Sequence, residues 1–266
     1  MILRLFLPCL LLTILFIQPA DAAVRKPVKK RYSPCKVSHP SDARVEWECY
    51  RLKKKETLEN VFGEMWQDVA RFNRMDRRHA WPGATLKVPR RLEEIRDFTP
   101  LPTELSVAEG DEKFILVDLT EQFLGAYEYG RLVFSFPIAS GDSSFVTPTG
   151  EFRVTAFSRN HASSLYKIEK TKVPYPMHYA LRFFINEKDV AFWIHGRDVP
   201  GYPASHGCVG LYDEEMQQKY YRIPEKPLLE AAKTLYEWAI FPNPDDGEFH
   251  TLKNGPFVLI IGESPI

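Results

Sequence analysis

The feature that most restricts the fold of this 266-residue chain is a series of short, β-branched and aromatic segments that begins at residue 113. Turn-forming residues separate most of them, and we predict strands at 113–119, 123–129, 132–139, 151–157, 179–185, 190–194 and 257–261. Helices are predicted from the Asp213 cap to Arg222 and at 227–238. The expected outcome is a β-rich domain, an antiparallel β-sandwich or barrel-like sheet with flanking helices.

One loop between these strands gathers reactive side chains. His195, His206 and Cys208 lie in a glycine- and proline-rich stretch, 195–211. A thiol with a pKa of about 8.5 is mostly protonated at neutral pH, so a nucleophilic cysteine needs an imidazole to take its proton. His195 ends the apolar run 190–194, and a buried strand there would hold its ring. Three glycines would let the backbone turn N–H groups toward a developing negative charge: Gly201, Gly207 and Gly210.

Other interpretations of this loop remain open. Cys208 could be an inert buried thiol, since free cysteines are often buried in cores. Both histidines and the cysteine are also zinc ligands, but their spacing fits no zinc signature and no fourth ligand is evident. We therefore expect a catalytic cysteine, with no metal and no cofactor.

The loop resembles the signature of L,D-transpeptidases, which cross-link bacterial peptidoglycan through a cysteine acyl-enzyme. The shared pattern is His-Gly at 195–196, a short variable loop, and Ser-His-Gly-Cys-Val at 205–209. A second block, Ile-Ala-Ser-Gly at 138–141 and Thr-Pro-Thr-Gly-Glu-Phe-Arg-Val at 147–154, resembles that family's glycine loop and strand entry. Two separated motifs in the right order make the resemblance specific, and it covers roughly residues 114–262.

The resemblance implies catalytic roles for the loop residues. Cys208 would be the nucleophile and His195 the base and then the acid, with its ring oriented by the main-chain carbonyl of Gly196. The N–H groups of His206, Gly207 and Cys208 would stabilise the oxyanion. His206 would otherwise shape the loop.

The resemblance also implies the walls of a substrate cleft, formed by the loop 142–148 and the segment 175–179. The predicted substrate-binding residues are Met177, Tyr179, Trp193, Ser205 and Gly210. Tyr179, and one of the neighbours Phe192 and Trp193, could equally be core aromatics.

Position 210 departs from the resemblance, because the family usually has arginine there. An arginine fork suits a stem carboxylate, so Gly210 predicts a changed donor stem rather than inactivity. Arg182 or Arg197 is a candidate to supply the missing charge.

The first 23 residues have the order of a secretory signal. Arg4 precedes an apolar run, 5–17, and small residues follow. The run is shorter than the ~20 residues of a membrane span, although an uncleaved anchor is an alternative. We predict export to the periplasm or cell envelope, with no stable membrane span after cleavage.

Export decides how the cysteines pair. Cys35, Cys49 and Cys208 follow the signal, and in an oxidising compartment the two close cysteines are the expected pair. A Cys35–Cys49 bridge would contribute on the order of 3 kcal/mol and leave Cys208 free. Two free surface thiols are the alternative. Residues 24–49 form this disulfide segment together with a basic linker.

Residues 50–91 are predicted as a small α/β module. A strand at 50–52, a helix capped by Thr57, a helix at 66–72 and a strand at 85–89 give an order that resembles LysM, a binder of N-acetylglucosamine-containing glycans. The module departs from LysM at Lys55 and in its long middle, 74–80. Eleven basic and five acidic residues from Arg51 to Arg91 give a net charge of +6, which suits an anionic wall polymer.

The alternative for this module is an ordinary α/β domain that packs on the catalytic one. A linker at 92–112 and a catalytic domain at 113–263 complete the predicted organisation.

The sequence therefore predicts a peptidoglycan L,D-transpeptidase that acts on stem peptides and glycan. A formal net charge of zero argues against a nucleic-acid binder. If water rather than an amine resolves the thioester, the same residues make a carboxypeptidase or endopeptidase. A non-catalytic wall-binding protein is the alternative from a different class.

Overall fold

The computed structural model describes residues 33–266, all of which lie in one compact unit, Tyr32–Ile266. The predicted signal, 1–23, and most of the basic linker lie outside the described residues. Within 33–266, no helix combines the length and the apolar character that crossing a bilayer requires.

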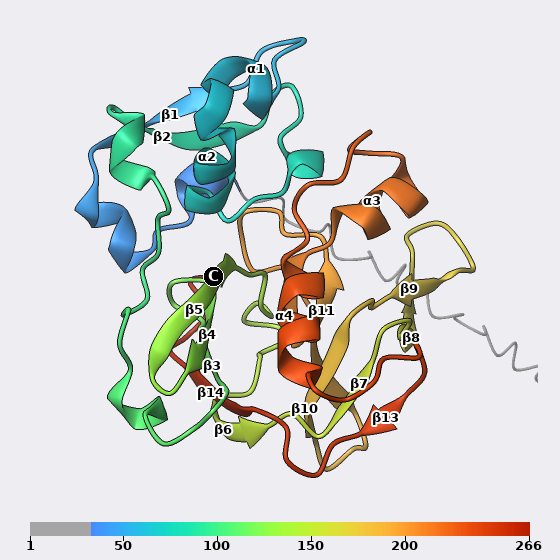
Figure 1. The fold of residues 1–266 in the computed structure, drawn as a ribbon. Coiled ribbons are helices and arrows are strands. Elements are labelled where there is room, and N and C mark those ends of the chain that lie inside the picture. The colour runs from blue at the N-terminus through green and yellow to red at the C-terminus, as the bar shows by residue number, and fades with distance from the viewer. Residues whose placement is uncertain (1–32) are drawn as a thin grey trace, which may run out of the picture. The chain divides into compact units, whose positions relative to one another are not determined.

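Two five-stranded sheets form the larger part of the fold (Figure 1). One has the order β5-β4-β3-β14-β6, and its strands are β3 (Phe114–Asp118), β4 (Phe123–Glu128), β5 (Arg131–Pro137), β6 (Gly150–Arg153) and β14 (Phe257–Ile261). The other has the order β12-β11-β10-β7-β13, and its strands are β7 (Ala156–Ser158), β10 (Ala180–Ile185), β11 (Ala191–Arg197), β12 (Val209–Tyr212) and β13 (His250–Thr251).

The predicted β-rich class is confirmed, but the sheets are mixed rather than wholly antiparallel. β3 pairs with β14 and β11 pairs with β12 in parallel. Parallel neighbours need a crossover connection of about a dozen residues, because the chain must return to the starting edge. Residues 198–208 make that crossover between β11 and β12, and we call them the cysteine loop.

The predicted strand 151–157 is two strands, β6 and β7, which belong to different sheets. The interval between the predicted strands 151–157 and 179–185 contains a hairpin of β8 (Ala162–Lys167) and β9 (Pro174–Pro176). Both differences arise from pairing with distant strands, which local sequence does not encode.

Strand alternation divides the apolar side chains between two cores. Ile115 and Val117 of β3 enter the core between the two sheets, whereas Phe114 and Leu116 face a second core. Both faces of this sheet are therefore covered, which explains why β3 and β4 are almost continuously apolar.

Two helices accompany the second sheet. Asp213 caps α3 (Glu214–Tyr221), as predicted, through a bond from the Met216 N–H to Oδ1 at 2.8 Å. The amphipathic α4 (Ala231–Ile240) packs against β10, β11 and β12 (Figure 1). Buried residues of α4 complete the core between the sheets: Ala232, Leu235, Tyr236 and Ala239.

The N-terminal module pairs β1 (Trp47–Arg51) with β2 (Thr85–Pro89) in antiparallel fashion around α1 (Leu58–Phe62) and α2 (Trp66–Phe72). The Thr57 hydroxyl caps α1 as predicted. Six short 3-10 helices occur within residues 33–266: Pro34–Lys36, Pro40–Arg44, Gly63–Met65, Arg77–His79, Leu92–Ile95 and Ser106–Ala108, which lies beside the turn between β4 and β5. The last two lie in the predicted linker.

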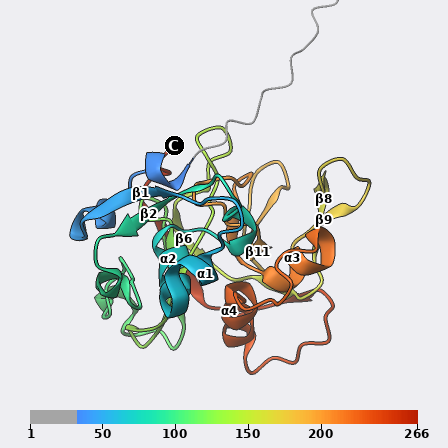
Figure 2. The ribbon, with the colours of Figure 1, turned by 90° about the horizontal axis from the view of Figure 1, so that it is seen from above.

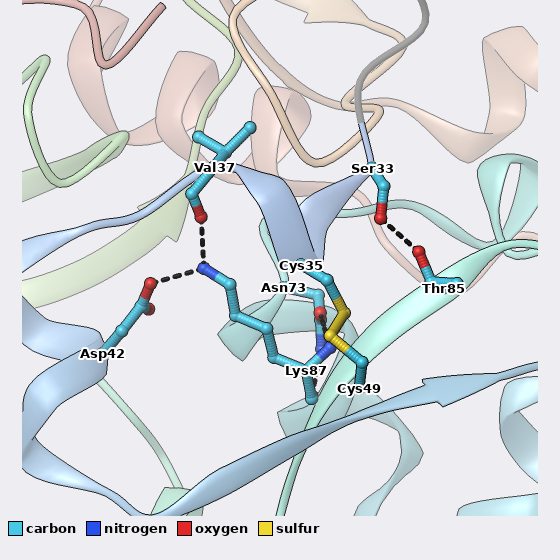
Figure 3. Close-up of a disulfide and its surroundings, with 8 residues drawn as sticks. All are labelled: Ser33, Cys35, Val37, Asp42, Cys49, Asn73, Thr85 and Lys87. Atoms are coloured by element: carbon cyan, nitrogen blue, oxygen red, sulfur yellow. Dashed lines mark hydrogen bonds and ion pairs between the residues drawn. A yellow bond between two sulfur atoms is a disulfide. The ribbon is translucent and has the colours of Figure 1, made fainter.

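A disulfide joins Cys35 to Cys49 of β1, with a Cα–Cα distance of 6.0 Å, as the sequence predicted (Figure 3). Next to it, the buried Lys87 ammonium donates to the Val37 carbonyl at 2.5 Å and forms an ion pair with Asp42. The disulfide segment is thus fixed to the module by a covalent bond and by a buried charge.

The second core joins the module to the β3–β4 sheet. Leu86 and Phe72 of the module pack there with Phe123 of β4. Arg74, which is 1% exposed, forms ion pairs with Asp42 at 3.1 Å and with Glu121, between β3 and β4, at 3.3 Å. Figure 2 shows this region from above. The module and the sandwich therefore share one core and buried charges.

Candidate active site

His195 lies on a strand, and Cys208 directly precedes the parallel strand that pairs with it. His195 lies within β11, and Cys208 comes immediately before β12. Their register places Ile194 opposite Val209 and His195 opposite Gly210. Because side chains alternate between faces, Ile194 and Val209 enter the sandwich core, whereas His195 and Cys208 face the other side. The two predicted catalytic side chains therefore share one face on adjacent strands.

The backbone fixes the orientation of the His195 ring. Its Nδ1 lies 2.8 Å from the carbonyl oxygen of Gly196, which can only accept, so Nδ1 carries a proton and Nε2 is the basic nitrogen. The Gly196 N–H donates to the His178 carbonyl at 2.8 Å. A Cβ at position 196 would lie 2.2 Å from Asp213 Oδ2, so this position requires glycine.

Burial keeps both reactive groups neutral at rest. It lowers the pKa of His195 to about 3, and the nearby Arg197 guanidinium acts in the same direction. Burial also raises the pKa of the Cys208 thiol, although a main-chain hydrogen bond from Trp193 and the charge of Arg197 oppose the rise. The site at rest therefore combines a neutral imidazole with an unionised thiol.

The tip of the cysteine loop, Ser205–Cys208, forms a turn closed by Ser205. The Ser205 hydroxyl donates to the Cys208 carbonyl at 2.5 Å and accepts from the Gly207 N–H at 3.0 Å. That bond occupies one of the three N–H groups predicted for the oxyanion. Gly207 has a φ of 104°, and a Cβ there would lie 2.6 Å from the Phe192 ring, so the turn requires glycine.

The glycine-loop motif, in the segment that follows β5, supports the tip. The Ser140 carbonyl accepts from the N–H groups of Ala204 and Ser205, each at 2.9 Å. Gly141 forms a parallel bridge with Ser205, and its N–H donates to the Thr147 hydroxyl at 2.9 Å. The two sequence blocks that carry the family resemblance are therefore adjacent in space.

The His206 ring contacts two aromatic rings. Tyr166 of β8 stacks on it with centroids 4.2 Å apart, and Phe145 meets it edge-on at 4.4 Å. Phe145 and Tyr166 are themselves 46% and 41% exposed. The tip therefore carries an aromatic surface open to solvent.

Met177 and Trp193 are buried and pack in one small cluster, which Cys208 contacts. The His161 ring lies 4.3 Å from that of Trp193. Tyr179 instead packs on the sandwich core and places its ring 5.6 Å from Tyr236 of α4. Of the predicted cleft residues, Met177 and Trp193 thus contact the cysteine, and Tyr179 contacts the helical side.

The base of the cysteine loop, Asp198–Gly201, contacts the N-terminal module. The Val199 N–H donates to Asp76 Oδ2 at 2.6 Å, and the Asp76 N–H donates to the Val199 carbonyl at 2.8 Å. The same carboxylate accepts from Gln217 at 2.7 Å and from the ring and main chain of His79 at 2.7 and 3.0 Å. Asp76, fully buried, therefore links the module, the loop base and α3.

Further contacts fix the same base. Met75 forms an antiparallel bridge with Pro200. A Cβ at Gly201, whose φ is 89°, would lie 2.6 Å from Pro34 and 3.1 Å from the Asn73 carbonyl. The sequence analysis named packing of the module on the catalytic domain as an alternative, but it did not identify the residues of this interface. Its only signal was the long middle of the module, 74–80, where the module departs from the LysM pattern.

Asp76, His79 and Asp198 bring ligand atoms within 4.8 Å of one another. Each already bonds to protein: Asp198 pairs with Arg78 at 3.1 Å and accepts from Gln217 at 2.9 Å. These three side chains therefore belong to a hydrogen-bond network at the loop base.

The family model of the L,D-transpeptidase catalytic domain, YkuD, matches residues 112–239. These residues are an L,D-transpeptidase catalytic domain. The predicted enzyme class is thereby confirmed. No curated protein matches the chain.

The structure is similar to solved L,D-transpeptidases of low sequence identity. The enzyme from Stackebrandtia nassauensis is 19% identical over 76% of this chain and 69% of that chain, with a TM-score of 0.41. The enzyme from Xylanimonas cellulosilytica is 20% identical over 73% and 79%, with a TM-score of 0.41. The transpeptidase LdtMt1 in complex with imipenem is 16% identical over 57% of this chain, with a TM-score of 0.37, and the match spans only 60% of its length.

Proposed function

We propose that the protein is a peptidoglycan L,D-transpeptidase that forms stem-peptide cross-links, or attaches another amine to a stem, through an acyl-enzyme on Cys208. One observation carries the proposal: His195 and Cys208 share one face of adjacent strands, and the Gly196 carbonyl holds Nδ1 of the histidine. Nε2 is then the nitrogen available for the thiol proton.

In the first half-reaction, His195 Nε2 takes the proton from Cys208 Sγ, and the sulfur attacks the carbonyl carbon of a stem-peptide bond. The C–S bond forms, the C–N bond breaks, and the histidine returns the proton to the leaving amine. In the second half-reaction an acceptor amine attacks the thioester carbonyl. It forms a new amide bond, and its proton passes through His195 to the departing thiolate.

The oxyanion needs donors that the loop has not already used. Because the Gly207 N–H already donates to the Ser205 hydroxyl, the Cys208 N–H is the proposed donor. Ser205 itself then acts by shaping the turn, and Met177 and Trp193 provide the apolar wall beside the thiol.

Two alternatives use the same fold. A carboxypeptidase or endopeptidase would let water resolve the same thioester. A non-catalytic wall-binding protein would keep only the glycan contact, but it would have no use for a ring held by Gly196 beside a free cysteine.

Gly210 is the basis of a finer proposal, that the donor stem differs from the diaminopimelate donor usual in the family. No arginine fork can come from this position to hold a stem carboxylate. Products from tripeptide, tetrapeptide and pentapeptide stems, compared between wild type and Gly210→Arg by mass spectrometry, test it. Identical cross-linked products from the two proteins, whatever their rates, would contradict it.

The N-terminal module is proposed to bind wall glycan, and the protein to act in the cell envelope after export. A surface hollow in this part of the chain is lined by Trp47 together with Glu46 and Arg90, a ring and polar groups of the kind that sugars contact. The Cys35–Cys49 disulfide agrees with an oxidising compartment.

The test of the main proposal is product analysis with the full exported chain. Defined stem peptides plus an acceptor amine are expected to give cross-linked products in wild type and none in Cys208→Ala. Trimmed stems alone would indicate the hydrolase. Neither product, with retention on insoluble peptidoglycan, would indicate the wall-binding protein.

A further inference from the structure

The side chain of Arg197 lies where a side chain at position 210 would lie. A Cβ built on Gly210 would come within 1.8 Å of Arg197 Cδ and 2.0 Å of Cγ. The register explains the overlap: Gly210 lies opposite His195, and Arg197, two residues further along β11, projects from the same face. The aliphatic part of Arg197 therefore crosses the space that glycine leaves open.

Beyond Gly210, the Arg197 guanidinium bonds to both ends of the segment that precedes the tip. Nε donates to the Asp198 carbonyl at 3.2 Å, and Nη2 donates to the Ala204 carbonyl at 3.0 Å. These two carbonyls are six residues apart in the cysteine loop. Charge-assisted hydrogen bonds are stronger than neutral ones, so a single side chain restrains the loop just before Cys208.

The charge of the same guanidinium acts on both reactive groups. It opposes the rise that burial causes in the pKa of the Cys208 thiol, and it lowers the pKa of His195. A fixed positive charge on this face favours the thiolate that forms when the proton leaves sulfur.

We infer that Arg197 is a positioning residue for Cys208: it restrains the cysteine loop and stabilises the thiolate, and Gly210 is the matched position that makes room for it. The inference rests on the proposed function, in which Cys208 is the nucleophile. An arginine is thus present at the site, but it is Arg197 of β11 and not a residue at position 210 of β12.

The structure separates Arg197 from the other candidate, Arg182. Arg182 of β10 donates to the Thr155 hydroxyl at 3.2 Å and places its guanidinium 5.5 Å from the Phe249 ring. Arg182 also lies 5.9 Å from the Trp193 ring, but its side-chain hydrogen bond is to Thr155, beside β7. Arg197 instead donates to the cysteine loop, and its charge shifts the pKa of both Cys208 and His195.

The test is a double-mutant cycle of Arg197→Ala and Gly210→Ala in the full chain. The first readout is the rate of Cys208 alkylation by iodoacetamide as a function of pH, which requires no turnover. His161, His178 and His195 remain in every variant, so a changed profile reports the guanidinium. The second readout is kcat and KM for cross-linking.

Arg197→Ala is expected to move the alkylation profile to higher pH and to lower kcat about 10-fold or more, with KM within about twofold. Gly210→Ala is expected to cause the same shift, because its methyl group displaces the arginine. In the double variant, Gly210→Ala is expected to add less than about a twofold effect, as coupled neighbours do.

Arg153→Ala is the matched control, because Arg153 on the other sheet also donates to a main-chain carbonyl, that of Gly255 at 2.7 Å. It is expected to leave both readouts unchanged. The inference is overturned by an unshifted profile in Arg197→Ala, by a rise confined to KM, or by effects that simply add. Activity in Cys208→Ala would instead overturn the proposed function.

Discussion

The base and the tip of the cysteine loop differ in how the fold satisfies their polar groups. At the base, a buried carboxylate from the N-terminal module binds the Val199 N–H, and further module residues close around Gly201. At the tip, Ser205 closes a short turn, and the His206 ring packs against side chains that remain almost half exposed.

Within the eleven residues 198–208, the base is therefore expected to contribute mainly to stability and the tip mainly to catalysis. The base is bonded to a second part of the protein, so changes there should unfold or loosen the molecule. The tip has a fixed backbone with open surroundings, which suits a site that must admit a peptide. The module thereby acquires a second proposed task besides glycan binding, since it supports the loop that carries the cysteine.

The largest expected effect is on rate at the tip. Cys208→Ala and Cys208→Ser should each lower kcat by roughly 10³-fold or more. Alanine has no nucleophilic group, and a serine hydroxyl activated only by an imidazole is a far poorer nucleophile than the thiol. Thermal unfolding should stay close to wild type. Steady-state cross-linking measures the rate, and calorimetry measures the unfolding temperature. Near-normal turnover in either variant would show that the tip does not carry the catalytic nucleophile.

The next effect is on stability at the base. Asp76→Ala removes the partner of Val199, Gln217 and His79 in a buried site, which should cost about 3 kcal/mol. For a protein of this size, such a loss lowers Tm by on the order of 10 °C. Asp68→Ala is the control, since Asp68 in the same module accepts an exposed bond from the Asp97 N–H.

Equal Tm values for Asp76→Ala and Asp68→Ala would show that the base is not held by this carboxylate. A fall in Tm with an unchanged alkylation rate of Cys208 would show that the base and the tip are independent.

A smaller effect is expected from the aromatic rings at the tip. Tyr166→Ala and Phe145→Ala remove exposed rings from His206, so stability should change by less than about 1 kcal/mol. The apparent KM for stem peptides should rise several-fold, because the ring surface beside the cysteine is lost. A large fall in Tm with an unchanged KM would show that these rings stabilise the fold, and that the tip resembles the base in this respect.

The smallest effect is the change of one stability difference with pH, and it is confined to the base. Burial alone would lower the pKa of His79, but the Asp76 carboxylate, assisted by Asp198 and opposed by Arg78, raises it overall. A raised folded pKa means that this stabilisation is complete below the unfolded value of about 6.5 and is lost as the pH rises through the folded pKa.

His79→Asn should therefore be less stable than wild type by about 1 kcal/mol near pH 6, with a smaller difference near pH 9. Denaturant unfolding at the two pH values measures this. A difference that is constant or grows with pH would contradict the assignment.

Much of the fold was predictable because its signals are local. The Thr57 and Asp213 caps, the bounds of α2 and β2, and most strands of the sandwich follow from periodicity and capping residues. The adjacency of the 138–154 block and the cysteine loop was implied only through the family resemblance.

The remainder depends on contacts between distant residues. Nothing in the local pattern of β11 and β12 distinguishes parallel from antiparallel pairing, so the crossover was not foreseen. Nothing in the sequence distinguishes Asp76 from the other four acidic residues of the module, yet its carboxylate accepts a hydrogen bond from Val199, 123 residues away. The overlap of Arg197 with Gly210 likewise depends on the strand register.

The central claim, an acyl-enzyme on Cys208, is tested most directly by mass spectrometry of the protein during turnover. The full exported chain is mixed with a defined stem peptide, quenched in acid and digested. The account predicts a stem acyl group on the peptide that contains Cys208, removed by hydroxylamine as a thioester should be, and absent from Cys208→Ala. Cross-linked product with no adduct on Cys208, formed equally well by Cys208→Ala, would contradict it.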